Sequence, residues 1–253
     1  MLGQNFNDLG SYIDFLDKIG DLKRISTEVD PELEISEISS KTIEDNGPAL
    51  LFENVKGSSF PVATNLFGSE ERLRVSLGCN PKELGEEILY FAEKAMPPKL
   101  DNLFKSFPFI KRLTNFRSKE QAFNSPCQQI QDEITLEDLP IIKCWPEDGG
   151  KFITMGLTIT ESPISKKPNM GMYRLQMHDK ERLRMHWHPH KGGATHYHEA
   201  RQLGQDFPAA IVLGGDPSLI FAAIAPLPEN INELLFSAFL KRKPITMCKA
   251  ICS

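Results

Sequence analysis

The sequence lacks any long apolar run, and this absence excludes one class of protein. Among its 253 residues no stretch of about 18 or more consecutive apolar side chains occurs, so no helix is expected to span a membrane. Residues 1–10 are polar and contain no apolar signal region, which argues against secretion. With 40% hydrophobic and 25% charged residues, the chain can still build an ordinary globular core, which excludes disorder as its dominant state.

Paired cysteines and an excess of positive charge are also absent. The five cysteines are scattered, odd in number and free of any CxxC pair. This pattern argues against a disulfide framework, fits a reducing compartment and predicts a cytoplasmic location. The net charge is −5 and the pI about 5.7. Broad electrostatic attraction to nucleic acid is therefore not expected, and no nucleic-acid partner is predicted.

Residues 1–115 are predicted to form a small α/β domain. Asp8 can cap a helix with apolar residues on one face, and Gly20 stands where a helix-ending glycine belongs. A second helix is expected to begin at Asp30 and Pro31 and to stop before residues 46–48. The other elements predicted here are strands at 21–29, 49–52 and 61–64, and helices at 69–77 and 81–95.

Residues 116–253 are predicted to form a second, strand-rich domain, which follows a proline-containing linker at 96–100 and a short basic helix at 103–116. A hairpin is expected to turn at 179–181. The predicted elements are strands at 152–160, 170–178, 182–188, 209–213 and 245–252, and helices at 194–203, 217–225 and 231–240. Because the last strand runs to the chain end, we expect an incomplete protein.

All six histidines lie between residues 178 and 198, which predicts a site in this stretch. In a strand, His186 and His188 would point to one face, and His188 is the better ligand candidate because Pro189 fixes the backbone behind it. On a helix, His196 and His198 cannot share a face, and we expect both in solvent. His178 is expected to be exposed at the hairpin turn, and His190 is placed to contact an anionic ligand.

Residues 169–174 form a second candidate group. The side-chain carbonyl of Asn169 suits a hard divalent ion, and the planar guanidinium of Arg174 suits a carboxylate or phosphate. The alternatives are a turn residue after Pro168 for Asn169 and a surface ion pair for Arg174. By itself Glu233 is a first-turn helix carboxylate. Residues 144–150 read as a polar turn around a buried tryptophan.

Several ordered motifs then carry a resemblance to a known family. They are GDLKRI (20–25), GPALLFEN (47–54), PCQQ (126–129), CWPED (144–148), NMGMYR (169–174), MHWH (185–188) and HKGGA (190–194). In these motifs the chain resembles the UbiD family of prenylated-flavin-dependent decarboxylases, nearly from end to end. The resemblance implies an α+β protein with a small α/β N-terminal domain, followed by a truncated split β-barrel of the flavin-reductase, FMN-binding type.

The resemblance also implies the cofactor and its ligands. The phosphate of prenylated FMN would be held through Mn²⁺, with a monovalent cation such as K⁺ as a further candidate. The metal ligands implied are Asn169, His188 and Glu233. The implied catalytic residue is Arg174, which would hold the substrate carboxylate. The implied cofactor contacts are Met172, Tyr173, Arg174, His186, Trp187, His188, Lys191 and Gly192.

The activity implied is non-oxidative decarboxylation of an aromatic or other unsaturated acid. The closest fit is 4-hydroxy-3-polyprenylbenzoate in ubiquinone or menaquinone biosynthesis. The implied partners are a flavin prenyltransferase that supplies the cofactor, further copies of the chain in a homo-oligomer, and a membrane surface approached through a lipophilic substrate. Members of the family are about twice as long, and the acidic residue that donates the proton falls in the half that is missing here.

Two other functions remain open at this point. The chain would be a catalytically inactive fragment if its gene stops early. Without the resemblance, the histidines suggest a metal-dependent hydrolase that uses His186, His188 and Glu199 and needs no flavin.

Overall fold

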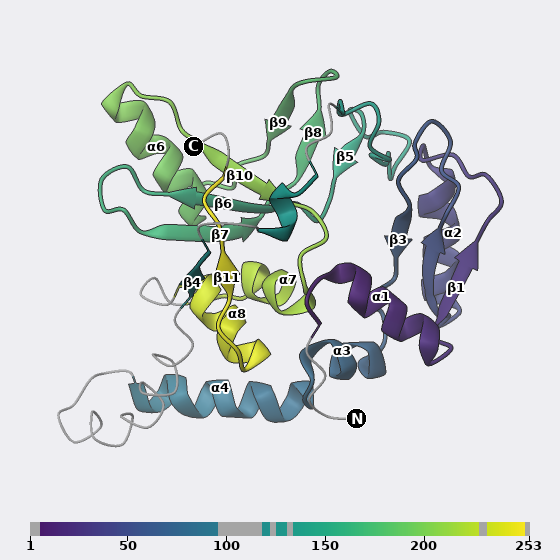
Figure 1. The fold of residues 1–253 in the computed structure, drawn as a ribbon, viewed down its shortest axis with the longest axis horizontal. Coiled ribbons are helices and arrows are strands. Elements are labelled where there is room, and N and C mark those ends of the chain that lie inside the picture. Colours follow the sequence, from purple (N-terminus) through teal and green to yellow (C-terminus); the bar gives the residue numbers. More distant parts are fainter. Residues whose placement is uncertain (1–5, 96–117, 122–124, 131–133, 228–231, 251–253) are drawn as a thin grey trace.

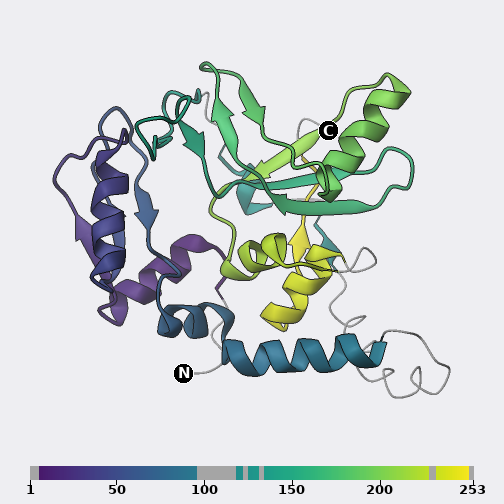
Figure 2. The same ribbon diagram turned by 180° about the vertical axis from the view of Figure 1, so that it is seen from behind.

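The computed structural model describes residues 6–95, 118–121, 125–130, 134–227 and 232–250. These residues form a mixed α/β fold, drawn in Figures 1 and 2. The predicted linker at 96–100, the whole of the basic helix predicted at 103–116 and the division between residues 115 and 116 lie outside them.

The N-terminal domain is built on a three-stranded sheet whose central strand is buried on both faces. β1 (Leu22–Ile25) pairs in parallel with β2 (Ala49–Phe52), and β3 (Val62–Thr64) pairs antiparallel on the other side. Alternate residues of β2 point to opposite faces. Ala49 therefore packs with the helix α1 (Leu9–Lys18). Leu50 and Phe52 pack on the other face with the helix α2 (Glu34–Glu44).

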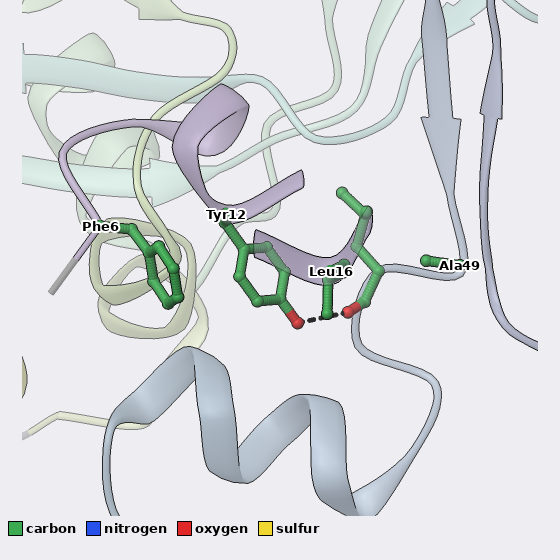
Figure 3. Close-up of a cluster of buried hydrophobic side chains, with 5 residues drawn as sticks. Phe6, Tyr12, Leu16 and Ala49 are labelled. Carbon is green, nitrogen blue, oxygen red and sulfur yellow. Dashed lines mark hydrogen bonds between the residues drawn. The ribbon is translucent and has the colours of Figure 1, made fainter. Parts of the chain in front are cut away.

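Helix α1 begins and ends where the sequence predicted. The Asp8 carboxylate accepts a hydrogen bond from the backbone N–H of Ser11 at 2.7 Å, and Gly20 follows the helix with a φ of +77°. Figure 3 shows the core beneath this helix, where Tyr12 lies between Phe6 and Leu16. The Tyr12 hydroxyl donates to the backbone carbonyl of Leu66 at 2.8 Å, which satisfies the polar end of a fully buried ring.

Helix α2 begins three residues later than predicted. Residues 31–33 do not start the helix because their backbone pairs with Lys143: the Leu33 N–H donates to the Lys143 carbonyl, and the Lys143 N–H donates to the Pro31 carbonyl. The Asp30 side chain accepts from the Glu32 N–H at 2.9 Å, which closes a local turn instead. This segment links the two halves of the molecule.

The second domain contains two small antiparallel sheets. β10 (Ala209–Val212), β6 (Leu157–Glu161) and β7 (Pro168–Met172) form one, in that order. The other consists of β5 (Phe152–Ile153), β8 (Leu175–Met177) and β9 (Leu183–Met185). The predicted hairpin is confirmed, because β8 and β9 pair across the turn at 179–181.

The single strands predicted at 152–160 and 170–178 are each divided in two. The breaks lie side by side, because the Tyr173 N–H reaches the Gly156 carbonyl at 3.4 Å where the chain passes from one sheet to the other. A Cβ at Gly156 would stand 2.7 Å from the Leu175 side chain. At this break a Cβ would require the Leu175 side chain to shift, and glycine avoids that contact.

Helices cover both faces of the β10–β6–β7 sheet (Figures 1 and 2). α6 (Gly192–Leu203) lies on one face, while α7 (Pro217–Ile224) and α8 (Glu233–Lys241) lie on the other. Met170 of β7 packs with Ala222 and Leu234 in the core on the α7 and α8 side. Adjacent residues of β7 must then face α6.

The remaining elements connect the domains and close the second one. α3 (Glu70–Leu77) and α4 (Pro81–Ala95) follow the first sheet, and the short 3₁₀ helix η1 (Pro126–Gln128) comes later. β4 (Lys119–Glu120) pairs in parallel with β11 (Thr246–Met247), so the strand predicted at 245–252 is only two residues long within the described part. Phe67 and Phe221 meet across the domains with ring centroids 5.1 Å apart.

The described strands fall into separate small sheets, and no closed barrel is found among them. The split barrel of the flavin-reductase type therefore remains a prediction. In the same part of the chain, no helix combines the length and the apolar character needed to cross a bilayer.

Candidate functional site

Glu233 contacts the free edge of β7 next to Asn169. β7 is an edge strand of its sheet, so some of its backbone N–H groups have no strand partner. The Met170 N–H instead donates to Oε2 of Glu233 at 3.2 Å. This contact places the Glu233 carboxylate beside the backbone of Asn169, although the two residues are far apart in sequence.

Two glycines allow the start of α6 to approach Asn169. A Cβ at Gly192 would lie 2.2 Å from the Asn169 Oδ1, and a Cβ at Gly193 would lie 2.5 Å from the Trp187 ring. The Gly193 N–H donates to the Tyr173 hydroxyl at 3.1 Å, and the Tyr173 and Trp187 rings pack edge to face at 4.9 Å. Larger residues would push the helix away from β7.

The starts of two helices therefore lie against β7, one at Asn169 and the other at Met170. Gly192 begins α6, and Glu233 is the first residue of α8, which is capped by the Asn232 side chain accepting from the Leu234 N–H at 2.7 Å. Helix N-termini carry partial positive charge and favour an anion such as a phosphate. The nearby Asn169 and Glu233 oxygens favour a hard cation. The edge of β7 therefore has groups that favour an anion and groups that favour a cation.

His196 lies in the same region, and the prediction that it is solvent-exposed is wrong. Its side chain is 8% exposed, and Nδ1 lies 3.1 Å from the Thr160 hydroxyl on β6. Burial lowers the pKa of His196, and the negative charges of Glu199, Glu233 and Glu161 oppose that shift. His196 is thus held against the sheet, where burial favours the neutral form of its imidazole.

The other histidines are more exposed. His178 and His198 are exposed as predicted. His186 and His188 follow the end of β9 at Met185, so the strand predicted at 182–188 ends before both of them. The His188 carbonyl accepts a hydrogen bond from the Lys191 N–H at 3.0 Å. The His188 and His190 ring centroids are 5.9 Å apart. His188 therefore stands on the turn that leads into Gly192, as an exposed side chain.

Arg174 forms an ion pair, which was the predicted alternative to binding a carboxylate or phosphate. Its guanidinium lies 2.8 Å from the Asp148 carboxylate and 3.7 Å from the centroid of the Phe152 ring. Asp148 also closes the predicted turn by accepting from the Trp145 N–H at 3.2 Å. Trp145 is 65% exposed, so its prediction as a buried ring is wrong. The turn holds Arg174 through Asp148.

The hydrolase alternative fails on geometry. Among the described residues there is no group of three or more His, Cys, Asp or Glu side chains placed to hold a metal ion. Glu199 instead accepts a hydrogen bond from the Ser162 hydroxyl at 2.6 Å. The metal centre proposed from His186, His188 and Glu199 is therefore not formed.

The sequence analysis missed two supporting residues, His196 and Asp148. His196 shares the buried face of α6 with Gly193 and Ala200, a spacing of three and then four residues that signals a helix face turned inward. Asp148 was quoted only as part of a motif, and nothing in the local sequence indicates its pairing with Arg174.

Comparison with known proteins decides the family. Residues 119–252 match the sequence model described as "3-octaprenyl-4-hydroxybenzoate carboxy-lyase Rift-related domain" of UbiD. Residues 13–91 match that of the corresponding N-terminal domain. The chain belongs to the UbiD family. The resemblance seen in its motifs is thereby confirmed.

Individual relatives align over nearly the whole chain. A protein of Aquifex aeolicus (strain VF5), described as uncharacterized, is 39% identical over 254 residues, which is 99% of this chain and 52% of that protein. HmfF from Pelotomaculum thermopropionicum, solved with FMN, has a TM-score of 0.78 at 25% identity, over 97% of this chain and 51% of that one. Vanillic acid decarboxylase from Sedimentibacter hydroxybenzoicus in its closed form has a TM-score of 0.79 at 25% identity, over 99% and 52%. This chain spans about half the length of these relatives.

Proposed function

We propose that this chain is the cofactor-binding part of a non-oxidative carboxy-lyase that acts on an aromatic acid. The observation that carries the proposal is that the start of α6 lies close to Asn169 while Glu233, at the start of α8, contacts the adjacent Met170 N–H, in a chain of the UbiD family. The description of the family names a carboxy-lyase, and solved relatives contain FMN or prenylated FMN.

The residues at the edge of β7 fit a metal-bridged flavin phosphate. Among the described residues nothing accepts a hydrogen bond from the buried Nδ2 of Asn169, which indicates that this side chain is prepared for a partner outside the protein. Its amide oxygen and the Glu233 carboxylate suit Mn²⁺, and K⁺ would also find oxygen ligands here. The third proposed ligand is His188, which lies on the turn just before Lys191.

The other proposed cofactor contacts surround this point. Met172, Tyr173 and Arg174 follow Asn169 along the chain. Trp187 packs on Tyr173, and His186 precedes it. Lys191 caps the start of α6, and Gly192 follows it. A lysine and backbone N–H groups at a helix start suit a phosphate group, and the two aromatic rings would keep water away from it.

The residues of the chain bind and orient the reactants. When bound, prenylated FMN supplies an electrophilic ring system that accepts the electron pair released as CO₂ leaves. Arg174 holds the substrate carboxylate through its planar guanidinium, in exchange for its present partner Asp148. No residue is proposed here as the proton donor, because the chain spans about half the length of its relatives.

The finer parts of the proposal follow from the family resemblance. The substrate proposed is 4-hydroxy-3-polyprenylbenzoate in quinone biosynthesis, and the cofactor supplier is a flavin prenyltransferase. We further propose a homo-oligomer, a cytoplasmic location with approach to a membrane through the polyprenyl group, a division into domains 1–115 and 116–253, and a split barrel completed in the full-length protein.

Co-production with a flavin prenyltransferase tests the proposal. The purified chain is expected to show a flavin absorption band and bound manganese. Asn169→Ala is expected to lose both, whereas His198→Ala, which alters an exposed histidine of α6, keeps both. A folded but colourless chain would contradict the proposal.

A second measurement separates a working enzyme from an inactive fragment. CO₂ release from substituted hydroxybenzoates is measured with the chain alone and with the C-terminal half of a full-length relative added. Release in the second mixture supports the carboxy-lyase. Cofactor binding without release in either mixture favours the inactive fragment.

A further inference from the structure

Two cysteines that lie far apart in the sequence meet outside the site described above. The Sγ atoms of Cys127 and Cys248 are 3.4 Å apart, across a separation of 121 residues. Both are free thiols, as are Cys79 and Cys144. A disulfide needs the two sulfur atoms to move to about 2.05 Å, which is a short approach from this starting distance.

The fold holds both partners on ordered backbone. Cys248 directly follows β11, which pairs in parallel with β4. Cys127 lies within η1, and the next side chain, that of Gln128, donates to the Lys249 carbonyl at 2.7 Å. The Gln121 N–H donates to the Met247 carbonyl at 2.8 Å. Hydrogen bonds on both sides of the thiol pair therefore fix its position.

A small oxidant can reach the pair. Cys127 is exposed, and Cys248 is partly buried. The hydrogen bond with Cys248, together with burial, raises the pKa of Cys127, so this thiol keeps its proton to higher pH than an isolated one. The closeness of the sulfur atoms, and not an acidic thiol, is what distinguishes this pair from Cys79 and Cys144, the other cysteines in the described part of the chain.

We propose that Cys127 and Cys248 form a reversible disulfide and so constitute a redox modification site. A low-molecular-weight disulfide is the oxidant. One thiolate attacks it, forms a mixed disulfide and releases one small thiol. The second cysteine, as its thiolate, then attacks the protein sulfur of that mixed disulfide and releases the other small thiol. In total the protein loses two electrons and two protons, and the oxidant gains them.

The disulfide would fasten β11 to η1. Ile245 and Met247 pack with Leu234 and Ala238 of α8, the helix that begins at Glu233. Oxidation therefore restrains the segment that supports one side of the site, and it closes a long loop in the unfolded chain. The closed loop lowers the entropy of the unfolded chain and so favours the folded state of the oxidised protein.

Peptide mapping after treatment with oxidised glutathione tests the cross-link. The chain carries Cys252→Ser, because a further thiol four residues after Cys248 in the sequence could compete in the reaction. A peptide pair that joins Cys127 to Cys248, lighter by two hydrogen atoms and separated by dithiothreitol, is expected. Only mixed disulfides with glutathione, or no modification at these positions, would overturn the proposal.

Thermal unfolding provides the second readout. Oxidation is expected to raise the Tm by roughly 5–15 °C, and dithiothreitol is expected to reverse the change. Cys248→Ser should abolish the shift, and Cys144→Ser, which removes an unrelated thiol, should retain it. An equal shift in Cys248→Ser would show that the stabilisation has another source.

Discussion

At the scale of single residues, Gly192 determines how closely α6 approaches Asn169. Gly192→Ala adds a Cβ 2.2 Å from the Asn169 Oδ1, so the amide must move away from its position. We expect manganese affinity to fall by about 10- to 100-fold, as for other changes that disturb a metal ligand indirectly. Titration with Mn²⁺ measures this effect.

Gly85→Ala is the matched control for that substitution. Gly85 lies within α4, and nothing stands within 4 Å of an added Cβ. Alanine there should stabilise the helix by about 0.5–1 kcal/mol and leave metal affinity unchanged. If Gly192→Ala and Gly85→Ala both bind Mn²⁺ as tightly as the parent chain, displacing the Asn169 amide does not affect metal binding. That result would contradict the role of Asn169 as a metal ligand.

His196 gives the molecule a pH dependence. Because burial lowers its pKa in the folded state, the unfolded chain takes up the proton first as the pH falls below about 6.5. The stability contributed by the neutral imidazole is present above that pH and is lost below it. In metal-free protein, His196→Gln should flatten the decline in unfolding free energy between pH 6.5 and lower values, and the exposed His198→Gln should not. Equal slopes in all three proteins would show that His196 titrates normally.

Local signals located some of these residues and missed others. Asn169 was a candidate from its side-chain chemistry, and Glu233 became one only through the family resemblance, although each alone also has an ordinary explanation as a turn or first-turn residue. The placement of His196 depends on which face of α6 meets β6, and the alternation of polar residues around it concealed that face. The Asp148 and Arg174 pair joins two loops, and contacts of that kind leave no periodic pattern in sequence.

At the scale of elements, a buried ion pair joins the start of α7 to the end of α8. Asp216 caps α7 by accepting from the Ser218 N–H at 2.9 Å, and its other oxygen lies 2.8 Å from Lys241 Nζ. Their side chains are 5% and 14% exposed. Asp216→Asn leaves the lysine without its counter-charge and should cost about 3–5 kcal/mol, measured by chemical denaturation.

Two further variants show whether burial is the cause. Asp216→Asn combined with Lys241→Met should recover part of the loss, because it removes the unpaired charge as well. Glu71→Gln breaks an exposed pair with Arg74 and should cost less than about 1 kcal/mol. A loss for Asp216→Asn as small as that for Glu71→Gln would contradict this interpretation.

Elements with one strong signal were predicted well, and elements shaped by distant contacts were not. The caps of α1 and the apolar run of β2 are local, and both were placed correctly. The late start of α2 results from pairing with Lys143, and the break at Gly156 from the passage of Leu175. Those partners are remote in sequence, so no local pattern could show them.

At the scale of the whole molecule, the architecture explains why the site lies where it does. The first sheet packs between α1 and α2, and the second domain packs α6 against one face of the β10–β6–β7 sheet and α7 and α8 against the other (Figure 1). The edge of β7 is then the place where helix starts from both faces meet. Residue patterns alone predicted two units, each with strands and helices. The family and its cofactor were predicted from the ordered motifs.

Calorimetric titration of FMN into the purified chain, with and without Mn²⁺, tests the central claim most directly. We expect FMN to bind in the presence of Mn²⁺ and much more weakly in its absence. Asn169→Ala and Glu233→Gln should remove this dependence on metal, and His198→Ala should preserve it. FMN binding that is indifferent to Mn²⁺, or that survives unchanged in both site variants, would contradict the claim that Asn169 and Glu233 hold the metal that binds the flavin phosphate.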